Sequence, residues 1–221
     1  MPVDAALAAL IDHTLLRPEA LPAEIEHLCD EARAYAFRTV CVQPCFVSLA
    51  AGRLAGAPIG VATVVAFPHG AAVTSAKVFE TRQAVADGAT EIDMVANLGW
   101  VRAGDAQALG DEVAAVVEAA AGIPVKVILE TALFPDAARK TVMARAAAAA
   151  GAAFVKTSTG YGPGGATIED VALLRAAVGG QVGVKASGGI RTRAQALAMV
   201  AAGATRIGAS ASPVLVTLPD R

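Results

Sequence analysis

Short runs rich in β-branched residues alternate with alanine-rich stretches of helical periodicity through most of the chain. The runs that predict strands lie at 10–12, 39–43, 59–66, 91–95, 125–130, 154–157, 182–187 and 206–208. The stretches that predict helices lie at 22–35, 75–87, 106–121, 136–150, 168–178 and 193–202. Regular alternation of this kind indicates parallel strands joined by right-handed helical crossovers.

Glycine follows several of the predicted helices, at Gly88, Gly122, Gly151 and Gly203, where it supplies the left-handed residue that ends a helix. No linker divides the chain, and the alanine-rich tract 144–153 fits a small-faced helix packed on a barrel. We therefore predict an α/β fold, a single (β/α)8 TIM barrel domain over residues 1–221. An open doubly wound sheet is the alternative, but GxGxxG is absent after the early strands.

The composition excludes several classes of protein. With 55% hydrophobic and 17% charged residues the chain can bury a large core, and its net charge of -2 provides no broad basic field for nucleic acid. Cys29, Cys41 and Cys45 are too few for a disulfide framework and lack the further ligands of a zinc site. The segment 1–16 has no positive start, and no apolar run reaches the roughly 18 residues of a membrane span. We expect a cytoplasmic protein with no membrane partner.

Two lysines, Lys156 and Lys185, lie near the ends of short apolar runs just before glycine-rich turns. An interior lysine is costly to bury, and two on neighbouring strands repel each other. Burial and a like charge both favour the neutral amine. A neutral lysine amine attacks a carbonyl to form a Schiff base, so the pair predicts a Schiff-base chemistry.

Side chains alternate along a strand, so one set faces the barrel lumen and the other faces the helices. The alternation turns Thr157 outward and predicts an inward set of Cys41, Glu91, Asp93, Lys126, Glu130, Lys156 and Lys185. Glu91 and Lys126 sit early on their strands and are expected to be deep and structural, while Glu130 is open to either role. Asp93, Lys156 and Lys185 lie near strand ends, where barrel enzymes assemble their active sites, and are the predicted catalytic residues.

Two glycine-rich segments, 186–190 and 207–212, follow the last two predicted strands. In barrels a phosphate commonly binds where these loops meet, because small residues let backbone N–H groups approach an anion. The simpler interpretation is that the two segments are tight turns with no ligand. The positions favour a phosphate site at Gly188, Gly189, Gly208 and Ser210, with a helix that starts at Ser210 or Ser212 and further amides from 161–166.

Motifs in order along the chain resemble the deoxyribose-phosphate aldolase family. They are IDHTLLRP at 11–18, VCVQP at 40–44, FPHG at 67–70, EIDMVANLG at 91–99, KVILET at 126–131, FVKTSTG at 154–160, VKASGGIRT at 184–192 and RIGAS at 206–210. The combination of KTSTG, a second lysine before SGG, and EIDMV is specific. The resemblance implies reversible cleavage of 2-deoxy-D-ribose 5-phosphate to D-glyceraldehyde 3-phosphate and acetaldehyde, without metal or organic cofactor.

The resemblance also implies individual roles. Lys156 resembles the Schiff-base lysine, Lys185 the second lysine that depresses its pKa, and Asp93 the acid/base partner. Asp12 and Cys41 resemble a supporting acid and a pocket-lining cysteine, and Thr157 is taken as a further supporting residue. Partners would be a phosphorylated sugar, aldehydes and other copies of the chain in a dimer or tetramer.

One feature of the family is not carried over. Some members end in a tyrosine that reaches the active site, whereas this chain ends in VTLPDR and has only Tyr35 and Tyr161. Two other functions stay open at this point: a Schiff-base aldolase for a phosphorylated ketose, which would refuse acetaldehyde as donor, and a phosphate-binding barrel without catalysis.

Overall fold

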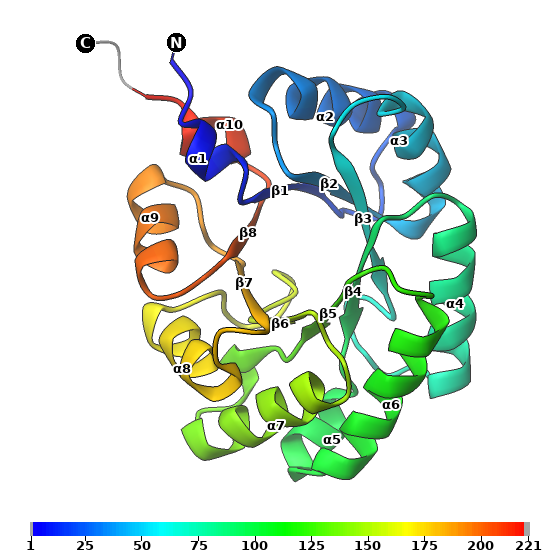
Figure 1. Cartoon of the computed structure of the whole chain (residues 1–221), viewed down its shortest axis with the longest axis vertical. Helices are drawn as coiled ribbons and strands as arrows, with labels where there is room; N and C mark the ends of the chain where they lie inside the picture. Colours follow the sequence, from blue (N-terminus) through cyan, green and yellow to red (C-terminus); the bar gives the residue numbers. More distant parts are fainter. Residues whose placement is uncertain (1, 219–221) are drawn as a thin grey trace.

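In the computed structural model, which describes residues 2–218, strands β1 to β8 form one closed parallel barrel in chain order (Figure 1). The strands are β1 Ile11–Leu15, β2 Thr39–Val42, β3 Gly60–Val65, β4 Glu91–Val95, β5 Val125–Ile128, β6 Phe154–Lys156, β7 Gly183–Ser187 and β8 Arg206–Ala209. The closed order confirms the predicted (β/α)8 fold and excludes the open sheet. The end of the VTLPDR tail, residues 219–221, lies outside the described residues.

Helices surround the barrel and pack on the outer side of the strands (Figure 1). The longer ones are α2 Pro22–Tyr35, α3 Val47–Arg53, α4 Thr74–Ala86, α6 Ala106–Ala119, α7 Ala137–Ala149, α8 Ile168–Val178 and α9 Arg193–Ala201. The short ones are α1 Ala5–Ala8, α5 Leu98–Ala103, α10 Ser212–Val216 and the 3₁₀ turns η1 Pro44–Phe46 and η2 Thr131–Leu133. The sequence missed α3 and the short helices other than α10, because none is long enough to show a clear helical period.

The predicted boundaries differ by a few residues where local backbone geometry ends an element. Strand β5 stops at Ile128 rather than at Glu130, because Glu130 has a φ of 54° and leaves the extended conformation. The alanine-rich tract forms α7, whose buried Met143, Ala144 and Ala147 present a small face to its neighbours. Within residues 2–218 no helix has the length and apolar character to cross a membrane.

Strand alternation divides the interior into two parts, as the sequence predicted. Outward side chains such as Val40, Ile92 and Val127 join the large core between strands and helices. Inside the barrel a small apolar cluster forms from Leu16, Cys41, Ala62 and Val64, with Phe67 packed against it. Charged side chains fill the rest of the lumen, so the site has an apolar wall beside a charged one.

A buried ion pair outside the barrel fixes the main chain after β4. Lys77 of α4 and Glu112 of α6 are fully buried, and Nζ lies 2.8 Å from Oε1. Lys77 Nζ also donates to the Val95 carbonyl at 2.8 Å, and Glu112 Oε2 accepts from Asn97 N at 3.0 Å. The pair therefore satisfies main-chain groups just beyond the strand that carries Asp93. The sequence pattern did not identify it, because the two residues lie on different helices and no local pattern encodes their contact.

Replacing Lys77 by Met should destabilise the fold by about 3–5 kcal/mol, because Glu112 would stay buried without a partner. Urea unfolding measures the change. The double variant Lys77→Met/Glu112→Leu should recover much of the loss, since well-packed apolar pairs often replace a buried ion pair at little cost. A double variant no more stable than the single one would contradict this account.

Candidate active site

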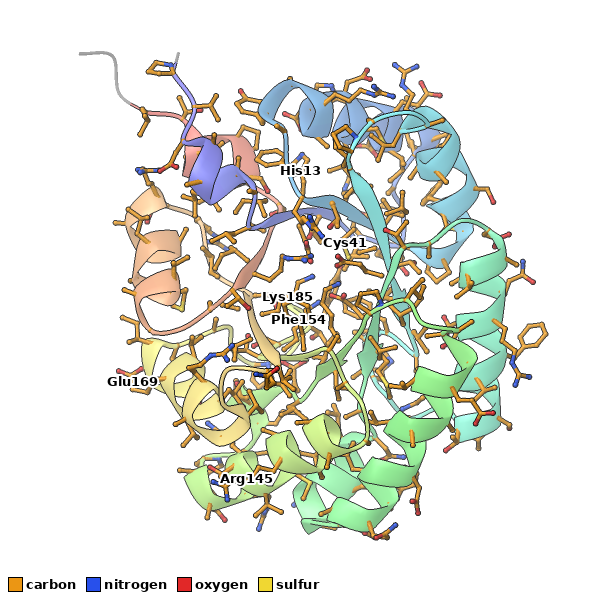
Figure 2. The ribbon with its side chains drawn as sticks, viewed as in Figure 1. His13, Cys41, Arg145, Phe154, Glu169 and Lys185 are labelled. Carbon is orange, nitrogen blue, oxygen red and sulfur yellow. The ribbon has the colours of Figure 1, made fainter. Side chains whose placement is uncertain are left out.

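Asp93 on β4 binds three lysines in the barrel lumen. Its Oδ1 accepts from Lys126 Nζ at 2.6 Å, and its Oδ2 accepts from Lys156 Nζ and Lys185 Nζ, both at 2.7 Å. Figure 2 shows Lys185 and Cys41 in the middle of the barrel. All four charged side chains are buried. One carboxylate thus holds together the two lysines that the sequence singled out.

The strand register produces this arrangement. Lys156 and Lys185 are direct partners on β6 and β7, and Asp93 and Lys126 are direct partners on β4 and β5. Residues in register on neighbouring strands point to the same face, so these side chains meet inside the lumen. The sequence predicted the inward set but could not supply the register that brings Lys126 onto Asp93.

A second layer of charge lies at the floor of the barrel around Arg206 on β8. Arg206 Nη1 donates to Asp12 Oδ1 at 2.6 Å and to Glu91 Oε2 at 2.7 Å. Lys126 Nζ lies 2.6 Å from Glu91 Oε2, and Lys185 Nζ donates to Asp12 Oδ2. We call the whole group the lumen network: Asp12, Glu91, Asp93, Lys126, Lys156, Lys185 and Arg206.

Arg206 was missed from the sequence, although it opens a predicted strand. Its guanidinium also lies 5.2 Å from the centre of the Phe154 ring, which Figure 2 places beside Lys185 in the view. Glu91 and Lys126 lie in this deep part, where the sequence placed them.

The two lysines on β6 and β7 differ in proton affinity. Burial lowers the pKa of Lys156, and the positive charge of Lys185 lowers it further against the opposing pull of Asp93. Burial also acts to lower the pKa of Lys185, but the carboxylates of Asp12 and Asp93 outweigh it and raise that pKa well above its usual range. The expectation of a lowered pKa holds for Lys156 in direction, and Lys185, expected as the positive neighbour that lowers it, keeps its charge because it has two carboxylate partners.

Two acidic groups of the lumen network, Asp93 and Asp12, are held ionised. Burial alone would raise the pKa of Asp93, but Lys126, Lys156 and Lys185 outweigh it and hold the pKa well below its usual value. Asp12 behaves in the same way, with Lys185 as the largest opposing charge. Asp93 at rest is therefore a proton acceptor, and Lys185 is the protonated partner beside it.

A cavity of about 470 Å³ opens above the lumen network. Of that network, only Lys156 lines the cavity among the described residues. The predicted phosphate residues Gly188, Gly189, Gly208 and Ser210 also line it, so the structure brings them to the same space as Lys156. Asp93, Lys185 and Asp12 do not line the cavity. They are linked to Lys156 by a chain of contacts, in which Asp93 binds Lys156 and Lys185, and Lys185 binds Asp12.

Several cavity residues were not identified from the sequence. They are Thr14–Arg17 at the end of β1 and just beyond it, Thr159 and Gly160 after β6, and Arg191 after the first glycine-rich segment. Arg17 and Arg191 bring positive charge to the wall, and both stand in motifs that resembled the aldolase family, IDHTLLRP and VKASGGIRT, although neither was given a role there. The helix expected at Ser210 or Ser212 begins at Ser212 and is only five residues long.

Two supporting residues differ from their expected places. The Thr157 hydroxyl donates to the Ser187 carbonyl and accepts from Ser187 N, both at 3.1 Å, so it ties β6 to the end of β7 and does not line the cavity. Cys41 is fully buried in the apolar cluster and likewise does not line the cavity. Burial raises the pKa of Cys41 to about 11, which keeps it a thiol at neutral pH.

The loop after β6 is held over the cavity by Glu130 and by an aromatic pair. Glu130 Oε2 accepts from Thr159 N at 3.1 Å and from Thr159 Oγ1 at 2.5 Å. The Tyr161 ring meets the Phe67 ring edge to face, with centres 5.3 Å apart. Glu130, left open by the sequence, therefore anchors a cavity loop from below.

The sequence pattern of the DeoC/LacD family aldolases matches residues 6–213. The chain belongs to the DeoC/LacD family of aldolases. A deoxyribose-phosphate aldolase of Bacillus licheniformis is 52% identical to this DeoC/LacD aldolase over 211 residues, covering 95% of this chain and 94% of that protein. The deoxyribose-phosphate aldolase of Coprothermobacter proteolyticus is 53% identical and covers 92% of both chains.

A solved structure supports the same placement of this DeoC/LacD aldolase. The tetrameric deoxyribose phosphate aldolase of Aeropyrum pernix superposes with a TM-score of 0.89 at 35% identity, covering 95% of this chain and 88% of that one. The family found by comparison agrees with the one that the motifs resembled.

Replacing Lys185 by Met should raise the pKa of Lys156, because a neighbouring positive charge disappears while Asp93 stays negative. The rate of imine formation with an aldehyde, measured against pH, should shift to more alkaline values. Lys140→Met provides a control, since Lys140 pairs with Asp170 away from the lumen and should leave the profile unchanged. An unaltered profile in the Lys185 variant would remove this lysine from the control of Lys156.

Proposed function

We propose that this DeoC/LacD aldolase reversibly cleaves 2-deoxy-D-ribose 5-phosphate to D-glyceraldehyde 3-phosphate and acetaldehyde through a Schiff base on Lys156. The observation that carries the proposal is the position of Lys156. It is the lysine that lines the cavity, and burial together with Lys185 lowers its pKa, which leaves its amine free to attack a carbonyl. The names of the relatives from Bacillus licheniformis and Coprothermobacter proteolyticus support the substrate.

The chemistry follows from the neutral amine. Lys156 Nζ adds to the C1 aldehyde and loses water through a carbinolamine to give an iminium. The iminium accepts the electron pair of the C2–C3 bond as that bond breaks, the C3 hydroxyl proton leaves, and D-glyceraldehyde 3-phosphate departs. The remaining enamine takes up a proton at carbon, and water then releases acetaldehyde and restores the lysine.

Asp93 is the residue placed to move protons at Lys156, since its Oδ2 lies 2.7 Å from the reacting nitrogen. The surrounding lysines hold Asp93 ionised, so it can take up protons that leave the carbinolamine, directly or through water. Lys185 acts through Asp93, which it helps to hold ionised by donating to the same oxygen, Oδ2. Asp12 in turn holds Lys185 protonated.

The other end of the cavity suits a phosphate. Gly188 and Gly189 have φ values of 86° and 78°, a conformation that turns successive backbone groups toward one side and that glycine adopts readily. Arg191 and Arg17 add positive charge to the same wall. Binding energy from the phosphate would orient the aldehyde end toward Lys156.

We extend the proposal to assembly and location. The tetrameric relative from Aeropyrum pernix supports a homo-oligomer, as do the exposed apolar side chains of Val73 and Phe79 at α4. The three free cysteines, Cys29, Cys41 and Cys45, support a reducing, cytoplasmic location. Use of acetaldehyde as donor distinguishes this function from a ketose aldolase, and a covalent adduct distinguishes it from a non-catalytic phosphate-binding barrel.

Acetaldehyde with borohydride should inactivate the enzyme and add an ethyl group of about 28 Da, because hydride reduces an imine to a stable secondary amine. Peptide mass spectrometry should place the ethyl group on Lys156. Lys156→Ala should lose rapid labelling and activity together, and exposed lysines should label far more slowly because they are protonated. Rapid labelling at Lys126 or Lys185 instead would show that the nucleophile is wrongly assigned.

Replacing Ser210 by Asp would put a carboxylate at the phosphate end of the cavity. The KM for 2-deoxyribose 5-phosphate should rise by at least about tenfold, while kcat/KM for unphosphorylated 2-deoxyribose should change little, because only the former carries a charge that Asp repels. Steady-state kinetics on both sugars provide the measurement. Equal losses for the two substrates would mean that this loop does not bind the phosphate.

A further inference from the structure

His13 on β1 is a buried histidine that the reaction does not use. It is 2% exposed, and Figure 2 places it away from Lys185 and Cys41, toward α2 and α10. Its Nδ1 lies 3.0 Å from Ser212 Oγ, and its Nε2 lies 2.9 Å from Glu31 Oε2. The ring also contacts the Phe37 ring, with centres 5.0 Å apart. These contacts fix the orientation of the imidazole from both ends.

Ser212 connects this histidine to the loop after β8. Ser212 is fully buried, and its hydroxyl donates to the Ala209 carbonyl at 2.9 Å. Ser212 Oγ lies within hydrogen-bond distance of both His13 Nδ1 and the Ala209 carbonyl, and a hydroxyl that gives its single proton to Ala209 accepts from Nδ1–H. His13 and Ser212 therefore hold one carbonyl oxygen, at the last residue of β8, on the side of the strand that faces β1.

The position of that carbonyl determines the direction of the next amide. The peptide between Ala209 and Ser210 is planar and trans, so Ser210 N–H points away from the Ala209 oxygen and toward the side of β8 on which β7 lies. The cavity wall on that side includes Gly188 and Gly189. Among residues 2–218 no acceptor takes a hydrogen bond from Ser210 N–H, which leaves this donor free for a ligand.

We propose that His13 and Ser212 are positioning residues that hold the Ala209–Ser210 peptide with its N–H directed at the phosphate of the substrate. If the peptide rotated, the Ala209 oxygen would face the anion instead and repel it. The inference rests on the function proposed above, because it assigns a phosphate to this end of the cavity. It adds residues outside the cavity that determine the preference for a phosphorylated sugar.

The test replaces Ser212 by Ala in the full chain. The KM for 2-deoxyribose 5-phosphate and the inhibition constant of inorganic phosphate should both rise about three- to tenfold, the effect of losing one buried hydrogen bond. The kcat, and kcat/KM for unphosphorylated 2-deoxyribose, should stay within about twofold, because Lys156 and Asp93 are untouched. His13→Phe, which keeps the ring contact with Phe37 but cannot donate, should change the same constants in the same direction.

Thr217→Val is the matched control, since the Thr217 hydroxyl donates to Pro213 O within α10 and does not contact the loop. It should leave all constants unchanged. Equal losses for both sugars, or unchanged phosphate inhibition in both variants, would overturn the proposal. If Ser212→Ala does not fold, His13→Phe decides by the same criteria.

Phosphate binding measured without turnover distinguishes this inference from the proposed aldolase function. In the wild-type protein the Ser210 amide resonance should shift on titration with inorganic phosphate, and in Ser212→Ala the midpoint of that shift should move to higher phosphate. A wild-type Ser210 amide that does not respond to phosphate overturns this inference while leaving Lys156 chemistry intact. Failure to cleave 2-deoxyribose 5-phosphate, with a normal amide response, overturns the proposed function and not this one.

Discussion

The balance of charge in the lumen network controls the properties of the site. Four basic side chains, Lys126, Lys156, Lys185 and Arg206, face three carboxylates, Asp12, Glu91 and Asp93. A buried group of this kind is most stable when its charges cancel, which requires one base to be neutral. Arginine does not deprotonate in proteins, and Lys126 and Lys185 each contact more than one carboxylate. Lys156 has only Asp93 as a charged hydrogen-bond partner among the described residues, and burial lowers its pKa while the pKa values of Lys126 and Lys185 are raised.

The barrel is what allows such a network to exist. The seven charged residues come from six of the eight strands, with Glu91 and Asp93 both on β4, and the parallel register directs their side chains into the lumen. Outside the lumen, Lys77 and Glu112 bind the main chain after β4, and Glu130 binds the loop after β6. The reactive amine thus depends on contacts made on both faces of the sheet.

Much of this could be predicted from the sequence, because strand alternation is local and needs only the next two residues. It placed Asp93, Lys156 and Lys185 in the lumen, and the glycine-rich segments identified the loops after β7 and β8. Alternation also turned Thr157 away from the lumen, and the structure shows that its hydroxyl binds Ser187. Alternation does not predict the register between neighbouring strands, nor which side chains contact each other. The raised pKa of Lys185 depends on Asp12, which lies 173 residues earlier in the chain, and no local pattern encodes that contact. Lys77 and Glu112 were missed for the same reason.

The separation of the cavity lining from the lumen network has a consequence for how this protein can change. Cavity-lining residues such as Tyr161, Arg191 and Ser210 belong to loops beyond the strand ends, whereas the charged partners of Lys156 are buried inside the barrel. Substitutions in the loops can therefore alter which acceptor aldehyde fits without disturbing the reactive nitrogen. Substrate range and reactivity are therefore determined by different sets of residues in this fold. New substrate specificities can arise through substitutions in the loops.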